Sequence, residues 1–139
     1  MSAKQNVPVA GVVLCDERGR YLLVQEKQPK AYGLWNLPAG WVNEGETLQQ
    51  TAVREAKEEV GFDVELVDKK PLLSALNDTQ DRMLNSFLAK VVGGELKPQP
   101  EEILDAKWFS LSEVEKLYKD SKLRAEWVIA SIRKAENRK

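Results

Sequence analysis

The first part of the chain alternates between apolar runs and short polar breaks. Residues 7–14 (VPVAGVVL) are rich in β-branched side chains, which favour strands, and residues 21–25 form a second apolar run. The polar residues 16–19 (DERG) between them supply turn chemistry, so the pattern predicts a β-hairpin. A third, short strand is predicted over residues 34–40 (LWNLPAG), which end in a sharp Pro-Ala-Gly turn.

Residues 46–60 have the clearest helical pattern. Thr47 is suited to cap the start of this helix, and Gln50, three residues later, completes a capping box. Gly61 follows at the position where helices commonly end in a left-handed residue. Small and apolar residues recur at helical spacing and predict one buried face; they are Leu48, Thr51, Ala52, Ala56 and Val60.

The rest of the chain continues to mix strands and helices. Strands are predicted over residues 62–73, 83–92 and 106–109, and helices over residues 112–118 and 123–135. Strands on both sides of one central helix, followed by terminal helices, indicate a layered α/β fold with a mixed sheet. Because 139 residues is the size of one ordinary domain, we expect residues 1–139 to form a single unit.

The composition is that of an ordinary globular protein, with 42% hydrophobic and 31% charged residues. No apolar run approaches the roughly 20 residues that span a bilayer, and residues 1–15 lack the cleavage site of a signal peptide. We therefore expect a cytoplasmic protein without a membrane partner. The net charge of −1 argues against polymeric nucleic acid as a partner.

The chain contains no histidine, which excludes Ser-His and Cys-His nucleophilic pairs and histidine-ligated metal sites. Its single cysteine, Cys15, can form neither an internal disulfide nor a cysteine cluster for zinc. Catalysis would therefore have to use carboxylates, Lys, Tyr or a hard metal ion.

Three glutamates of the predicted central helix lie on one face. Glu55, Glu58 and Glu59 stand at positions i, i+3 and i+4, so their charges repel one another unless a cation lies between them. Mg²⁺ takes oxygen ligands of this kind and completes its shell with water and phosphate. The alternative is a solvated helix face with Arg54 and Lys57 as local partners, which is what such a cluster usually is when taken alone.

The residues around this cluster form a longer motif. Over residues 40–62 the chain fits G-x5-E-x7-R-E-U-x-E-E-x-G-U, where U is apolar, and it does so at every fixed position; these are Gly40, Glu46, Arg54, Glu55, Glu58, Glu59 and Gly61. This segment resembles the Nudix box. Ala56 departs from the family pattern, which usually has a bulkier aliphatic residue there. The resemblance extends to residues 9–25, to GLWNLPAG and to PEEILDAKWFSLSEV, and so covers most of the chain.

The resemblance implies an α/β/α sandwich with a mixed sheet and a Mg²⁺- or Mn²⁺-dependent hydrolase. By that resemblance the carbonyl of Ala39 binds the metal together with Glu55, Glu58 and Glu59, and Arg54 pairs with Glu46 to orient the carboxylates. Gly40 would allow a tight turn that aims the carbonyl at the metal. The proton acceptor would be Glu55 within the box or Glu102 in a later loop, with the neighbouring Glu101 as a rival of Glu102.

Several side chains are candidates for holding the substrate. Trp35 and Trp41 flank the predicted metal loop and could stack on a base, whereas the aromatic residues Tyr32 and Phe87 are weaker candidates because most strand aromatics are core residues. Arg82 and Lys27 could contact distal phosphates, and the alternative for each is a free surface charge.

The implied reaction is hydrolysis of a phosphoanhydride bond in a nucleoside di- or triphosphate or a related X-linked nucleoside diphosphate. The segments GLWN and LRAEWVIASIRKAE look most like the branch that hydrolyses nucleoside tri- and diphosphates and thiamine pyrophosphate with broad tolerance. The alternatives are a nucleotide-binding Nudix-fold module without activity, an ADP-ribose or dinucleoside polyphosphate pyrophosphatase, and an RNA decapping enzyme. The sequence leaves the substrate open, as well as the choice between monomer and homodimer.

Overall fold

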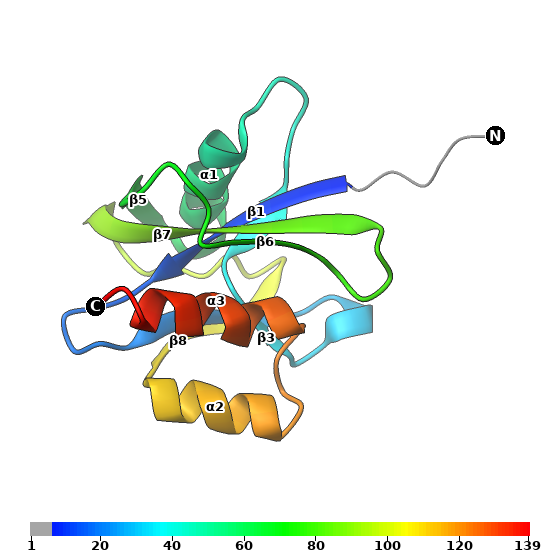
Figure 1. Ribbon diagram of the computed structural model, residues 1–139, viewed down its shortest axis with the longest axis vertical. Coiled ribbons are helices and arrows are strands. Elements are labelled where there is room, and N and C mark those ends of the chain that lie inside the picture. Colours follow the sequence, from blue (N-terminus) through cyan, green and yellow to red (C-terminus); the bar gives the residue numbers. More distant parts are fainter. Residues whose placement is uncertain (1–6) are drawn as a thin grey trace.

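The computed structural model describes residues 7–139 and has two β-sheets and three α-helices in these residues (Figure 1). The strands are β1 (Val7–Leu14), β2 (Tyr21–Glu26), β3 (Trp35–Asn36), β4 (Ala39–Trp41), β5 (Phe62–Leu66), β6 (Leu73–Leu76), β7 (Arg82–Gly94) and β8 (Ile103–Phe109). The α-helices are α1 (Leu48–Val60), α2 (Leu111–Lys119) and α3 (Glu126–Glu136), and a short 3-10 helix covers Pro29–Ala31. The expectation of no signal peptide rests in part on residues 1–6, which lie outside the described residues.

The larger sheet has the order β4-β1-β7-β5, and β6 also pairs with β7. It is mixed, because β1 and β7 run parallel while the other pairs are antiparallel. The smaller sheet has the antiparallel order β3-β2-β8. These sheets and the helices around them confirm the predicted mixed α/β architecture.

The predicted hairpin is wrong. Its turn forms as expected, with the Asp16 carboxylate accepting from the backbone N–H groups of Arg18 and Arg20 and with Gly19 at φ 78°. The strands then separate, and only an isolated bridge between Cys15 and Tyr21 joins them. Strand β1 already pairs with β4 on one edge and β7 on the other, so β2 joins the smaller sheet instead.

Alternate residues of β1 face the two helical layers. Ala10, Val12 and Leu14 pack in one core cluster with Ala52, Ala56 and Val60 of α1. Val13 belongs to a second cluster, which contains Trp127, Val128, Ile129 and Ile132 of α3. The period of two along the strand therefore places α1 and α3 on opposite faces of the larger sheet, as the α/β/α sandwich requires.

Helix α1 confirms the predicted capping. Thr47 Oγ1 accepts from the Gln50 N–H at 3.0 Å, and the Gln50 side chain accepts from the Thr47 N–H at 2.9 Å. Gly61 ends the helix with φ 85° and donates its N–H to the Lys57 carbonyl. The helix begins at Leu48, two residues later than predicted, because Thr47 is its cap and Glu46 lies in the preceding loop.

Two predicted strands are each divided between two elements. Residues 34–40 contribute β3 to the smaller sheet and β4 to the larger one, with Leu37 and Pro38 between them. Within residues 62–73, β5 ends at Leu66 and β6 begins only at Leu73. The segment between β3 and β4 thus joins the two sheets.

The last helix begins at Glu126, three residues later than predicted. The backbone N–H and carbonyl of Trp35 pair with residues 122–124 instead, so these residues do not join the helix.

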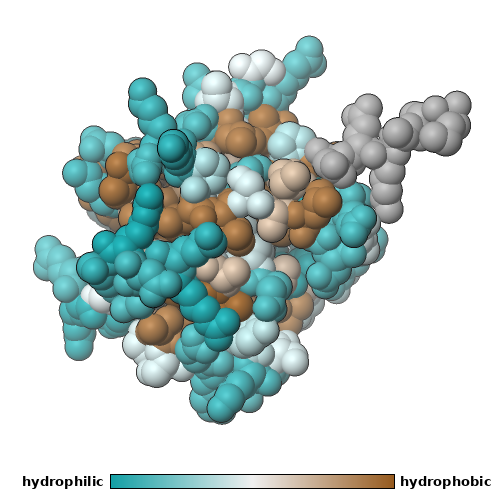
Figure 2. Space-filling model, viewed as in Figure 1, coloured by the Kyte–Doolittle hydropathy of each residue, from teal (hydrophilic) through white to brown (hydrophobic). Residues whose placement is uncertain are grey.

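Hydrophilic residues cover most of the face shown in Figure 2, with hydrophobic residues in a band across its middle. Leu76 of β6 and Val92 of β7 are among the exposed apolar side chains, so the helices leave part of the larger sheet open to solvent. In residues 7–139 no helix combines the length and the hydropathy that crossing a membrane would require. The cytoplasmic location stays a prediction.

We predict that Gly61→Ala destabilises the protein more than Gly33→Ala does. Both glycines have positive φ, 85° and 83°, where a Cβ costs about 1–2 kcal/mol. A Cβ on Gly61 would in addition overlap the Glu95 carbonyl oxygen, whereas nothing lies within 4 Å of one on Gly33. Urea denaturation should therefore show a loss near 1–2 kcal/mol for Gly33→Ala and a clearly larger one for Gly61→Ala. Equal losses would contradict the packing argument.

Candidate active site

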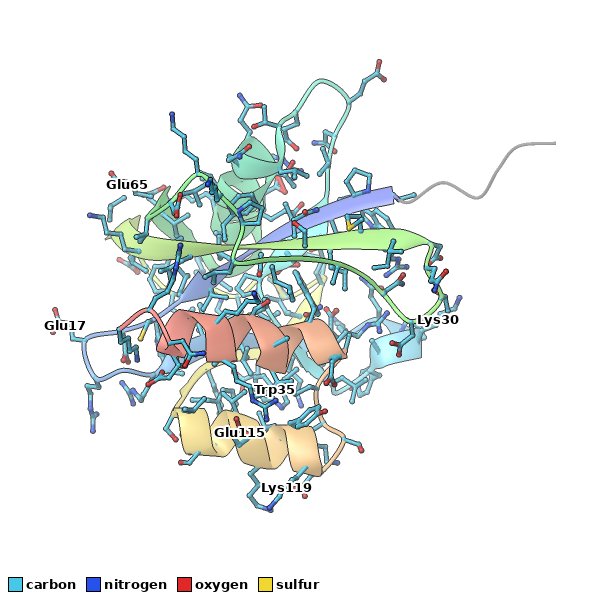
Figure 3. All side chains as sticks on the ribbon, in the orientation of Figure 1. Glu17, Lys30, Trp35, Glu65, Glu115 and Lys119 are labelled. Atoms are coloured by element: carbon cyan, nitrogen blue, oxygen red, sulfur yellow. The ribbon has the colours of Figure 1, made fainter. Side chains whose placement is uncertain are left out.

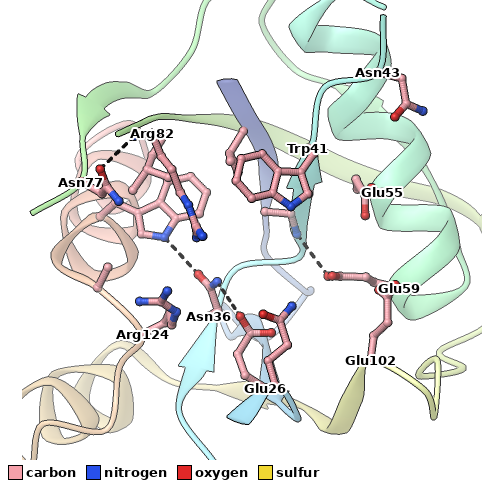
Figure 4. Close-up of a pocket in the computed structure, with 17 residues that line it drawn as sticks. Glu26, Asn36, Trp41, Asn43, Glu55, Glu59, Asn77, Arg82, Glu102 and Arg124 are labelled. Carbon is pink, nitrogen blue, oxygen red and sulfur yellow. Dashed lines mark hydrogen bonds between the residues drawn. The ribbon is translucent and has the colours of Figure 1, made fainter. Parts of the chain in front are cut away.

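A cavity of about 350 Å³ opens between the two sheets, beside the segment that joins them (Figure 4). Its walls come from β1, β2, β3, β4, β7, helix α1, the loop before β8 and the start of α3. The polar and aromatic residues that line it are Glu26, Gln28, Asn36, Trp41, Asn43, Glu55, Glu59, Asn77, Arg82, Glu102, Arg124 and Trp127, and Ala39 and Gly40 contribute backbone.

Helix α1 presents its three glutamates differently. Glu55 and Glu59 line the cavity, and Glu59 is buried, with 7% of its surface exposed. Glu58 is exposed, and its side chain accepts from Arg54 Nη1 at 3.0 Å. Spacing of i, i+3 and i+4 brings the three to one side of the helix, but only two of them face the cavity.

The Glu59 carboxylate carries the largest electrostatic cost of the site. Burial raises its pKa well above the ordinary value, the charge of Glu55 raises it further, and the hydrogen bond from the Ala39 N–H opposes both. That hydrogen bond measures 3.1 Å. Within residues 7–139 no Lys or Arg nitrogen lies within 4.0 Å of Glu59. A cation in the cavity would offset this cost.

Arg54 connects the loop before α1 to the carboxylates. It donates to both oxygens of Glu46, from Nε at 2.7 Å and from Nη2 at 3.0 Å. Its Nη1 donates to Glu55 at 2.8 Å and to Glu58 at 3.0 Å, and Nη2 donates to the Trp41 carbonyl at 2.9 Å. These five hydrogen bonds match the five N–H groups of a guanidinium. The hydrogen bonds from Arg54 to Glu46, together with those from Thr51 and the Asn43 N–H, lower the pKa of Glu46 to about 2.

Gly40 has a different role from the expected one. It lies in β4, paired with Ala10, and it is not one of the described glycines with positive φ. A Cβ at this position would overlap the carboxyl group of Glu55. The absence of a side chain is therefore needed for the close approach of α1 to β4, and the expected tight turn is not what requires glycine here.

The loop before β8 brings Glu102 to the cavity. The N–H groups of Lys97 and Gln99 donate to the carbonyls of Val60 and Glu59, at 2.7 Å and 2.9 Å, and so attach this loop to the end of α1. Glu102 lines the cavity, whereas its neighbour Glu101 does not.

The predicted substrate residues divide in a similar way. Trp41 is 46% exposed and lines the cavity, with the Arg82 guanidinium 4.7 Å above the centre of its ring. Trp35 is not brought to the cavity: it is 9% exposed and packs edge-on against Phe109, with ring centres 4.9 Å apart, beside α2 and α3 (Figure 3).

The weaker candidates also lie outside the cavity lining. Phe87 is fully buried in the core, and Tyr32 is exposed. The Lys27 ammonium group donates a hydrogen bond to the Pro100 carbonyl at 2.9 Å, which fixes the loop that carries Glu102.

Among the cavity residues that were not predicted from the sequence are Glu26, Asn36, Arg124 and Trp127. Glu26 is half-buried at the end of β2, where burial raises its pKa, and Asn36 Nδ2 donates to it at 3.2 Å. Trp127 Nε1 donates to Asn36 Oδ1 at 3.0 Å, which fixes the orientation of the amide. The available signal for Glu26 was a charged residue at the end of a strand, two positions after the apolar run that ends at Val24.

A comparison with known families decides the assignment. The NUDIX domain profile matches residues 5–130. The chain belongs to the Nudix family. The predicted Nudix box, residues 40–62, contains helix α1, whose ends are set by the capping box and the left-handed Gly61.

Individual proteins agree with this family. Putative nudix hydrolase 1 of Caenorhabditis elegans is 34% identical over 110 residues, which are 76% of this chain and 29% of that protein. The NAD-capped RNA hydrolase NudC of Stutzerimonas stutzeri is 37% identical over 94 residues, 68% of this chain and 33% of that protein. This chain thus spans about a third of the length of these two relatives.

A solved structure supports the Nudix fold. An ADP-ribose pyrophosphatase from Streptococcus suis superposes with a TM-score of 0.71 at 27% identity, and the match covers 97% of this chain and 94% of that one. The α/β/α sandwich with a mixed sheet is therefore confirmed.

The chemistry of the cavity fits a hard divalent cation. Four carboxylates line the cavity and offer only oxygen atoms as metal ligands, which Mg²⁺ and Mn²⁺ prefer; they are Glu26, Glu55, Glu59 and Glu102. Residues 7–139 contain no cluster of three or more His, Cys, Asp or Glu that is close enough to hold an ion by protein ligands alone. Mg²⁺ fits such a site because it usually keeps several waters and substrate oxygens in its shell.

We predict that Glu59→Gln stabilises the metal-free Nudix domain. Glutamine keeps an oxygen that accepts from the Ala39 N–H and removes a buried charge, which should raise the free energy of unfolding in EDTA by about 1 kcal/mol or more. The matched variant Glu58→Gln changes an exposed carboxylate and should bring no such gain. The increase in Tm that Mg²⁺ causes in the unmodified protein should be lost in Glu59→Gln. A metal-free Glu59→Gln protein less stable than the unmodified one would contradict this account.

Proposed function

We propose that this Nudix protein is a Mg²⁺-dependent hydrolase that cuts the phosphoanhydride bond of a small nucleotide. The substrate class is a nucleoside di- or triphosphate or another X-linked nucleoside diphosphate. The observation that carries the proposal is the meeting of buried Glu59 with Glu55 and Glu102 in one cavity large enough for part of a nucleotide.

The carboxylates of Glu55 and Glu59 would hold the metal together with the Ala39 carbonyl, and Glu58 would contribute from the rim. Mg²⁺ bound there would neutralise phosphate oxygens and lower the pKa of a water. Arg54 supports the proposal because its hydrogen bonds to Glu55 and Glu58 fix both carboxylates relative to β4. Gly40 leaves the space in which the Glu55 carboxyl group lies.

Glu102 is our choice as the proton acceptor. Burial raises the pKa of Glu55, but its carboxylate already accepts from the Arg54 guanidinium at 2.8 Å, and this charge-assisted hydrogen bond opposes protonation. Glu102 lines the cavity from the opposite loop, and no side-chain hydrogen bond to it occurs in residues 7–139. It can therefore accept a proton from water without first losing a cationic partner.

The residues of this site also bear on the alternative functions. A non-catalytic nucleotide-binding module has no need of the box carboxylates, and this chain retains all of them. Similarity to the Streptococcus suis ADP-ribose pyrophosphatase favours including ADP-ribose among the candidate substrates. Similarity to NudC adds NAD-capped RNA, although a net charge of −1 offers little attraction for an RNA chain.

The test is release of phosphate, pyrophosphate or nucleoside monophosphate from a panel of small nucleotides. The panel contains nucleoside tri- and diphosphates, ADP-ribose, dinucleoside polyphosphates, NAD, NAD-capped RNA and thiamine pyrophosphate, each with Mg²⁺, with Mn²⁺ and with EDTA. We expect metal-dependent turnover of a few members. If folded protein turned over none of them with either metal, the non-catalytic module would be the better description.

We predict that Glu102→Gln lowers kcat at least ~100-fold, the scale of a lost general base, while the fold is kept. Glu101→Gln is the matched control, because it removes the same charge one residue away and outside the cavity lining. It should change kcat by no more than about twofold, since exposed substitutions of this kind are nearly neutral. Equal losses in the two variants, or a kcat unchanged in Glu102→Gln, would remove Glu102 from the mechanism.

A further inference from the structure

Two arginines of the cavity wall have no carboxylate partner. Four other arginines form ion pairs with Asp or Glu, namely Arg20, Arg54, Arg133 and Arg138, and Arg18, which forms none in residues 7–139, is exposed. Arg82 and Arg124 are half-buried, yet in residues 7–139 neither has a carboxylate within 4.0 Å or a side-chain hydrogen bond. No side-chain nitrogen in residues 7–139 is both fully shielded from solvent and without a hydrogen-bond partner, so these two guanidinium groups reach solvent and a ligand in the cavity can accept from them.

The backbones of both arginines are held firmly. The Arg124 N–H donates to the Trp35 carbonyl at 2.7 Å, and the Trp35 N–H donates to the Lys122 carbonyl at 2.8 Å. The Arg82 N–H donates to Asn77 Oδ1 at 3.0 Å, at the point where β7 begins beside β1. The two guanidinium groups therefore start from fixed points on different elements and lie on the wall of the same cavity.

Arg82 is also oriented by its neighbour. Its guanidinium stacks over the Trp41 ring at 4.7 Å, an arrangement that uses the face of the cation. The N–H groups lie in the plane of the guanidinium, so they stay available for the paired oxygens of a phosphate or carboxylate.

The cavity has an acidic and a basic side. Figure 4 shows Arg82 and Arg124 on one side, Glu55, Glu59 and Glu102 on the other, and Asn36 and Glu26 in between. Glu26 is the carboxylate that faces the arginines, and their charges lower its pKa while burial raises it. Its carboxylate already accepts from Asn36, and its single charge leaves the two guanidinium groups with an excess positive charge.

We propose that Arg82 and Arg124 form a second anion-binding subsite, which selects substrates with an additional phosphate or carboxylate on the part of the molecule away from the metal-bound pyrophosphate. The inference rests on the proposed function, because it assumes that the acidic side holds the metal and the scissile phosphates. A substrate that spans the cavity would then place one anionic group at each end.

Equilibrium binding to the full chain with Mg²⁺ tests the subsite without turnover. The probes are AMP, adenosine 3′,5′-bisphosphate and α,β-methylene-ADP, measured by calorimetry. None of the three contains a phosphoanhydride bond. The bisphosphate carries its second phosphate on the sugar, and the methylene compound carries it in line with the first. We expect the bisphosphate to bind at least ~10-fold tighter than AMP, the scale of one charge-assisted hydrogen bond.

Variants decide whether the arginines cause this preference. Arg124→Gln and Arg82→Gln should each reduce the preference for the bisphosphate toward one, while affinity for AMP changes little. Arg18→Gln is the matched control, because Arg18 is exposed, also lacks an ion pair in residues 7–139 and lies outside the cavity lining. It should leave the preference unchanged.

Three outcomes would overturn the subsite. One is equal affinity for AMP and the bisphosphate, and another is a preference that survives both arginine substitutions. The third is an arginine-dependent gain for α,β-methylene-ADP alone, which would assign the arginines to the in-line phosphates. Because binding is measured separately from hydrolysis, loss of the proposed function would appear as a silent substrate panel, whatever the binding experiment shows.

Discussion

The hydrogen bonds of Arg54 are the contacts on which the site depends most. One guanidinium joins the loop at Glu46, the strand at Trp41 and two carboxylates of α1. Such a planar cation holds its partners in fixed directions, which a lysine ammonium cannot do. The position of α1 relative to β4 is thereby set by a charged group at the surface of the helix, while Ala52 and Ala56 set it from the core side.

The same region shows why the site is costly to the fold. Glu59 is buried with one backbone donor and no cation within 4.0 Å in residues 7–139, and Gly40 gives up a side chain so that Glu55 can approach β4. Both features weaken packing or raise electrostatic energy, and neither contributes to the hydrophobic core. Residues that reduce stability in this way are expected where binding of a ligand or a metal stabilises the folded protein and offsets the loss.

Local signals in the sequence predicted local structure well. The capping box of Thr47 and Gln50 and the left-handed Gly61 depend on residues within one turn, so the pattern alone was sufficient. The hairpin was wrong because both edges of β1 are taken by strands far away in the sequence, which no short window reveals. Trp35 looked suitable for a substrate because it precedes the Nudix box, but its position in β3 turns it toward Phe109.

The parts of the site that the sequence did not reveal are those assembled by the joining of the two sheets. Asn36 lies in the smaller sheet and Trp41 in the larger one, only five positions apart along the chain, so the cavity forms where this segment crosses between them. Arg124 reaches the same place because residues 122–124 pair with Trp35 before α3 begins. The Nudix box can thus supply its carboxylates from one helix, whereas the opposite wall, which determines what else a substrate must carry, depends on contacts between distant segments.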